Sequence, residues 1–161
     1  MAALTAYEQL LLELVNRARL DPAGEAARFG ISLNTGLAAG SLTASAKQVL
    51  APNELLVDSA RAHSQWMINT DIFSHTGSGG SDPGDRMGAA GYAFTGSWTW
   101  GENIAWFTGF DLAQAALIHF EGWRESDAGH YCALVSPRFT HLGVGALEDG
   151  TQSWAVQNFY G

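Results

Sequence analysis

Apolar residues recur at intervals of three or four in three stretches of the chain, the spacing that places them on one face of an α-helix. The first stretch opens with capping-box residues at Thr5 and Glu8 and stops before Asp21-Pro22. The second ends shortly before His75, which would lie in a loop directly beyond a rigid element. We predict three long helices, over about residues 6–20, from 53 to shortly before 73, and over about 111–124.

Two shorter patterns complete the expected elements. Asp82-Pro83 is a cap followed by a proline at the first helical position, and Gly91 is a stop signal, so a short helix is expected between them. Apolar runs over 142–147 and 154–159 are separated by a segment that contains Asp149-Gly150. Because Asp-Gly is a strong turn signal, we predict a β-hairpin at the end of the chain.

Length and composition are those of one globular domain over residues 1–161. The chain is 47% hydrophobic and only 15% charged, which is unlike a disordered tail. Residues 30–51 are rich in small and polar residues with weak periodicity, so we interpret them as a loop-rich insertion.

The charge balance argues against nucleic acid or an anionic membrane as a partner. The formal net charge is −8, with eight Lys and Arg residues that form no cluster. No apolar run reaches transmembrane length, and no signal-peptide pattern opens this chain. A single cysteine, Cys132, excludes an intramolecular disulfide and is typical of a small buried residue.

Candidate chemistry is concentrated in His75, Glu102 and His130, each beside glycine or another small residue. Neutral imidazoles bind transition metals, and a carboxylate can complete the ligand shell or act as a base. Their spacing fits no local metal motif, so they could meet only through folding. Metal binding, acid/base chemistry and ordinary hydrogen bonding all remain open at this point.

The sequence around these residues resembles the CAP superfamily, which comprises cysteine-rich secretory proteins, antigen 5 and plant pathogenesis-related 1 proteins and is also called the SCP domain. The resemblance covers about residue 10 to the C-terminus and keeps the family's order. It rests on Leu14-Val15-Asn16 with Arg19, Ala62-His63-Ser64 with Met67, Phe73-Ser74-His75, Asp85-Arg86-Met87, Ala90-Gly91-Tyr92, Gly101-Glu102-Asn103-Ile104-Ala105, Gly122-Trp123, Gly129-His130, Leu142-Gly143-Val144-Gly145 and Gln157-Asn158-Phe159.

This resemblance implies an α+β fold, a three-layer α-β-α sandwich with a central antiparallel sheet. It also implies a cleft with two histidines and two glutamates, in which His75 and His130 could bind zinc or another divalent metal ion. Glu102 matches the first glutamate. Ser126 stands where the family commonly has the second, and we favour Glu125 over Glu121 as its substitute.

Several functions follow from the resemblance. We expect a secreted, monomeric binding or interaction module of bacterial type, with a small-molecule, lipid or protein ligand in the cleft. One alternative is a zinc-dependent peptide or ester hydrolase, with Glu102 or Glu125 as the catalytic base. Another is a carrier of a lipid or sterol, and a third assigns Glu102 a purely structural role, accepting hydrogen bonds from both imidazoles.

Other polar residues are expected to support the scaffold. We place His63 in the core behind the site, interpret His119 and His141 as structural, and expect Asn16, Arg19 and Arg86 to tie helices to loops. The region around Glu102 is the most aromatic part of the chain and includes Trp98, Trp100 and Trp106. Such residues are usually core, but exposed ones would suit an apolar or carbohydrate ligand.

Overall fold

The computed structural model describes residues 3–34, 38–108, 112–125 and 130–161, without the side chains of 112–113, 123–125 and 130–132. The helices are α1 (Ala6–Leu20), α2 (Pro22–Arg28), α3 (Glu54–Thr70), α4 (Pro83–Ala89), α5 (Leu112–Glu125) and α6 (His130–Val135), with a 3-10 turn, η1 (Ser78–Gly80). The strands are β1 (Ala51–Pro52), β2 (Trp100–Thr108), β3 (His141–Asp149) and β4 (Gln152–Tyr160).

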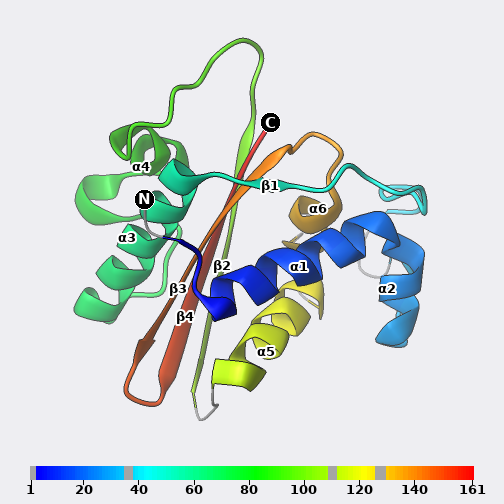
Figure 1. The fold of residues 1–161 in the computed structure, drawn as a ribbon, viewed down its shortest axis with the longest axis horizontal. Coiled ribbons are helices and arrows are strands. Elements are labelled where there is room, and N and C mark those ends of the chain that lie inside the picture. Colours follow the sequence, from blue (N-terminus) through cyan, green and yellow to red (C-terminus); the bar gives the residue numbers. More distant parts are fainter. Residues whose placement is uncertain (1–2, 35–37, 109–111, 126–129) are drawn as a thin grey trace.

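A sheet lies between two helical layers, as the α+β prediction required. Among the described residues it has the strand order β1-β3-β4-β2, so β2 is an edge strand. The three long strands are antiparallel, whereas the short β1 pairs in parallel with β3. Figure 1 shows α3 and α4 on one side of the sheet and α1, α5 and α6 on the other.

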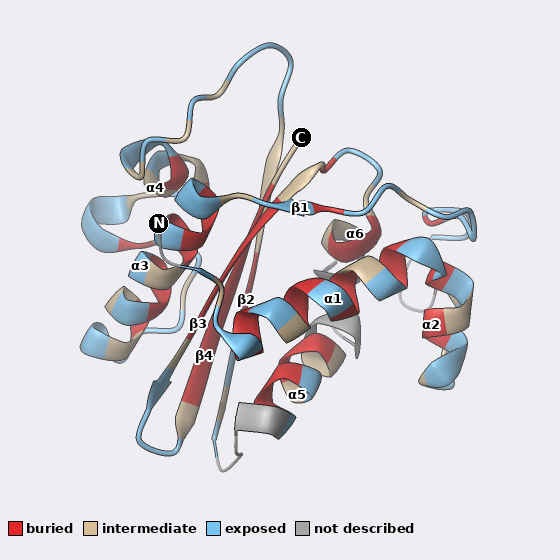
Figure 2. Ribbon diagram, in the orientation of Figure 1, coloured by how far each residue is buried: buried red, intermediate tan, exposed pale blue. Residues whose placement is uncertain are grey.

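The closing hairpin forms the centre of the sheet. Strands β3 and β4 pair from His141 with Tyr160 to Asp149 with Gln152, and the predicted Asp-Gly turn is confirmed, with Gly150 at φ 62°. Both strands are buried along most of their length (Figure 2). Burial on both faces follows from the helical layers above and below the sheet.

Each face of the sheet has its own core. On one face, apolar residues of α1, α5 and α6 pack on Leu142, Val144 and Phe159. On the other face, α3 packs Ala60 and Met67 against the sheet. Side chains alternate between faces along a strand, so on β2 the even-numbered residues, including Glu102 and Ile104, face α3.

The predicted helix starts are confirmed where they are described. Thr5 and Glu8 form the reciprocal capping box of α1, and the Asn53 side chain accepts hydrogen bonds from the first turn of α3. Asp82 and Asp85 form a second capping box at α4. Asp111, where the third long helix was expected to begin, lies outside the described residues.

Three elements differ from the sequence prediction. Asp21 caps an additional helix, α2, with Pro22 at its first position. Residues 100–108, for which no strand was predicted, form β2. His130 is the first residue of α6, a short helix that was not predicted from the sequence.

Two predicted scaffold residues tie helices to loops. The Asn16 amide donates to the Leu50 carbonyl at 3.1 Å and accepts from the Leu50 amide at 2.7 Å. The fully buried Arg19 guanidinium donates to backbone carbonyls on two separate segments, at residues 48, 134, 136 and 139. These contacts join α1 to the segments that precede β1 and β3.

Candidate functional site

The loop after α3 carries His75 to the edge of the sheet. α3 ends at Thr70, and the following residue, Asp71, turns the chain out of the helix with a φ of 54°. Inside the helix, His63 anchors the returning loop through a 2.9 Å hydrogen bond between its Nε2 and the Ser74 carbonyl. His75 therefore projects from a loop that is held at the preceding residue.

Glu102 is the central residue of the site. Its side chain is only 1% exposed, and each carboxylate oxygen has a partner. Oε1 lies 2.8 Å from His75 Nδ1, and Oε2 accepts from Arg86 Nη2 at 2.6 Å. The Asn158 amide is best assigned with its nitrogen toward Glu102, where it donates to Oε2 at 3.2 Å. A buried carboxylate needs such partners, because desolvation of an unpaired charge is costly.

Arg86, which projects from α4, connects the carboxylate to the His75 loop. Its Nη1 donates to the His75 carbonyl at 3.0 Å and to the Ser81 carbonyl at 2.8 Å, while Nη2 binds Glu102. The sequence predicted Arg86 as a scaffold residue, and these contacts confirm that role. Its direct ion pair with Glu102 was not predicted, since no local spacing relates residues 86 and 102.

The geometry selects one nitrogen of His75 for a ligand. A carboxylate accepts hydrogen bonds, so Nδ1 carries the proton that is shared with Glu102, and Nε2 is then the nitrogen whose lone pair could bind a metal. The side chain is 50% exposed, so a ligand can approach the ring. This carboxylate-histidine pair is an arrangement common behind metal-binding imidazoles.

His63 lies behind the site, as the sequence predicted. It is 1% exposed and stacks on Trp66 with ring centroids 5.5 Å apart. Burial lowers the pKa of this imidazole, and the nearby Arg86 guanidinium acts in the same direction, while the Glu102 carboxylate opposes them. The ring is therefore neutral at physiological pH, and its Nε2 proton donates to Ser74.

The remaining predicted site residues are only partly described. His130 is the first residue of α6, which contacts β2. The side chains of His130 and Glu125 lie outside the described part of the chain, and so does the whole of Ser126. Glu121 is half-buried on α5. Among the side chains that are described, no three His, Cys, Asp or Glu residues lie close enough together to hold a metal ion.

A buried polar network that sequence reasoning did not identify lies on the opposite face of the sheet. His119 Nε2 lies 2.5 Å from Ser153 Oγ, which lies 3.1 Å from the Tyr7 hydroxyl. Burial lowers the pKa of His119 to about 3 and raises that of Tyr7 to about 12. The structural role predicted for His119 is confirmed, because the ring is fully buried among α5 and β4 contacts.

Surface aromatics and one apolar pocket bear on the predicted ligands. Trp98 and Trp106 are 45% and 41% exposed, so part of the aromatic region does face solvent. An apolar pocket of about 510 Å³ lies between the start of α1 and β3 and is lined in part by Ala6, Leu10 and Leu147. No helix in the described ranges has the length and apolar character needed to cross a bilayer.

Comparisons with known proteins identify the family of this chain. The model of the cysteine-rich secretory protein family, CAP, matches residues 12–159. The uncharacterized protein YkwD of Bacillus subtilis is 36% identical over 114 residues, which are 69% of this chain and 40% of YkwD. The chain thus spans less than half the length of this relative.

Solved structures support the same assignment. An extracellular SCP-domain protein of Bacillus anthracis is 25% identical, with a TM-score of 0.63 over 99% of this chain and 44% of its own. An outer surface protein of Borrelia burgdorferi, at 14% identity, covers 99% of this chain and 95% of its own with a TM-score of 0.63. NaASP2, solved with Zn²⁺, is 20% identical, and the match covers 95% of this chain and 76% of NaASP2 with a TM-score of 0.56. At these lower identities the likeness shows the fold alone. The chain belongs to the CAP family of cysteine-rich secretory proteins.

Proposed function

We propose that this chain is an extracellular binding module whose His75 and His130 hold a divalent metal ion such as zinc. The supporting observation is the 2.8 Å contact between His75 Nδ1 and Glu102, with Glu102 itself held by Arg86. This contact orients Nε2 as the ligating atom before any ion arrives. The zinc in NaASP2 and the extracellular and outer-surface descriptions of the solved relatives support the same proposal.

A bound zinc ion would supply a Lewis acid to which a partner's carboxylate, carbonyl or imidazole could attach. The protein's own contribution is orientation. The buried Glu102 retains the His75 tautomer, and Arg86 holds both the carboxylate and the loop backbone. His130, at the start of the helix that contacts β2, would provide the second imidazole.

The contacts of Glu102 favour binding over hydrolysis. A general base needs a carboxylate oxygen within reach of the proton that it removes. Both oxygens of Glu102 already accept charged or polar donors, which favours an orienting role over a basic one. In the hydrolase alternative the base would therefore be Glu125. The alternative of a lipid or sterol carrier would use the apolar pocket beside α1.

Zinc titration by calorimetry tests the proposed site. The wild type should bind zinc, and the double variant His75→Ala, His130→Ala should show no binding at the same site. Glu102→Gln should weaken binding by about 10- to 100-fold, because the amide cannot orient the imidazole as the carboxylate does.

His141→Ala is the matched control, since it removes a half-buried histidine at the start of β3. It should leave the binding curve unchanged. Equal zinc affinity in the wild type and the folded double variant would reject the metal site. Circular dichroism of each variant checks that the fold is retained.

A further inference from the structure

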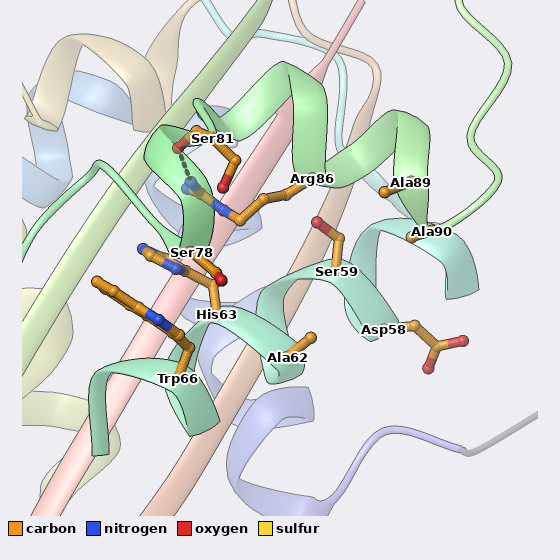
Figure 3. A pocket seen from close by; sticks show the side chains of 10 residues that line it. All are labelled: Asp58, Ser59, Ala62, His63, Trp66, Ser78, Ser81, Arg86, Ala89 and Ala90. Carbon is orange, nitrogen blue, oxygen red and sulfur yellow. Dashed lines mark hydrogen bonds between the residues drawn. The ribbon is translucent and has the colours of Figure 1, made fainter. Parts of the chain in front are cut away.

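A cleft lies between α3 and α4, and it shares Arg86 with the candidate metal site. Its volume is about 520 Å³, and its lining includes His63, Trp66 and Arg86 (Figure 3). As far as the described residues give it, the lining contains neither His75 nor Glu102. This volume lies within the range of small-molecule sites in proteins.

One wall of the cleft holds a buried hydrogen-bond acceptor. His63 Nε2 carries the ring proton and donates a hydrogen bond to the Ser74 carbonyl. Nδ1 of the neutral ring therefore carries a lone pair. The ring is 1% exposed, and among the described residues Nδ1 has no hydrogen-bond partner. An acceptor left in this condition is costly to the folded protein.

The facing wall holds a buried donor. Arg86 uses its two terminal nitrogens for Glu102, Ser81 and the His75 backbone. Its third nitrogen, Nε, has no hydrogen-bond partner within the described part of the chain. Figure 3 shows His63 extending from α3 and Arg86 from α4 toward the same end of the cleft.

The chemistry of the walls identifies the ligand class. A hydroxyl group both donates and accepts, so one ligand hydroxyl could satisfy His63 Nδ1 and Arg86 Nε–H together. The charge of Arg86 is already paired with Glu102, and Asp58 adds a carboxylate to the lining, so an anion is not favoured. Trp66 and Ala62 supply apolar surface beside serine hydroxyls.

We propose that the cleft between α3 and α4 binds a neutral polyhydroxylated ligand, a mono- or disaccharide, through His63, Arg86 and the Trp66 indole. Aromatic surface with a few polar groups that fix orientation is the usual composition of such sites. Because both nitrogens are buried, the cleft must widen locally for a ligand hydroxyl to reach them. Trp66 stacks on the face of the imidazole at an interplanar angle of 9°, which leaves the in-plane lone pair of Nδ1 directed past it.

Saturation-transfer NMR with glucose, N-acetylglucosamine and cellobiose tests the proposal. The wild type should show transfer to at least one of these sugars. Ala62→Trp fills the cleft with a large side chain and should weaken binding at least tenfold. Gln65→Trp places the same side chain on an exposed position of α3 outside the lining and should bind as the wild type does.

His63→Phe provides the second variant, since it keeps a stacked ring but removes the acceptor. It should also weaken sugar binding at least tenfold while circular dichroism shows a folded protein. Absence of transfer in the wild type, undiminished binding in Ala62→Trp, or competition by inorganic phosphate would overturn the proposal. The zinc titration of Ala62→Trp should match the wild type, which separates failure of this site from failure of the metal site.

Discussion

Arg19 is a charged residue in the interior of the protein, and backbone carbonyls surround it. Its side chain is fully buried and donates to Gln48, Leu134, Ser136 and Phe139 at distances of 2.6 to 3.1 Å. Arg19→Met would leave these carbonyls without their charged donor. We expect the free energy of unfolding to fall by about 3 kcal/mol, measured by urea denaturation.

Arg138→Met is the control for this substitution, because Arg138 is exposed near the same segment. Its effect on the free energy of unfolding should stay within about 0.5 kcal/mol. If both variants unfold at the same urea concentration, the carbonyl contacts of Arg19 contribute no more than a surface charge does.

At the residue scale, the sequence identified His75 and Glu102 as candidate site residues because each lies in a short family motif. In the structure His75 Nδ1 lies 2.8 Å from Glu102 Oε1. The ion pair of Arg86 with Glu102 could not be predicted, since it depends on how α4 lies against β2. The His63 Nδ1 atom, which has no hydrogen-bond partner among the described residues, could not be predicted either, because an absent partner leaves no pattern in a sequence.

At the scale of elements, two glycines of β3 allow α3 to lie close against the sheet. A Cβ at Gly145 would lie 2.2 Å from the Arg61 backbone nitrogen, and one at Gly143 would lie 2.1 Å from the Leu56 carbonyl carbon. These neighbours are backbone atoms of α3, which cannot move aside as the end of a flexible side chain can. Gly145→Ala should therefore lower the free energy of unfolding by about 2–3 kcal/mol in chemical denaturation.

Gly88→Ala offers a matched comparison within α4. There the added Cβ would meet a Phe94 ring atom at 3.5 Å, an ordinary contact. Alanine has a higher helix propensity than glycine, so the free energy of unfolding of this variant should rise by about 0.5 kcal/mol. A Gly145→Ala protein that is as stable as Gly88→Ala would show that α3 can move away from β3 without loss.

The elements predicted correctly are those with long periodic patterns or strong turn signals, such as α1, α3 and the β3-β4 hairpin. Strand β2 was missed because its apolar and polar residues do not alternate, with Gly101, Glu102 and Asn103 in succession. Helix α6 is too short to show a period. Helix α2 could have been found, since Asp21-Pro22 has the same form as the Asp82-Pro83 start of α4.

At the scale of the whole molecule, both helical layers bury ionisable side chains against the sheet. His63 lies in the α3 layer and His119 in the α5 layer, and burial lowers the pKa of each. Glu8, on α1, differs. Burial alone would raise its pKa, but hydrogen bonds from Arg61 and from the backbone amides of Thr5 and Ala146 outweigh it, so the pKa is lowered.

These pKa shifts predict that the folded protein loses stability in acid over two pH ranges, one for the histidines and one for Glu8. Below a pH of about 6.5 the unfolded chain protonates its histidines while the buried rings stay neutral, so stability falls by up to about 1.4 kcal/mol per pH unit for each ring. For His119 this loss continues toward the folded pKa of about 3. Glu8 adds its own loss of stability as the pH falls below 4.5, its ordinary pKa.

Urea midpoints measured from pH 8 to 4.5 should decline, and they should decline more gently in His119→Gln, since glutamine cannot take up the proton. Equal slopes in the two proteins would show that His119 is protonated in the folded state despite its burial.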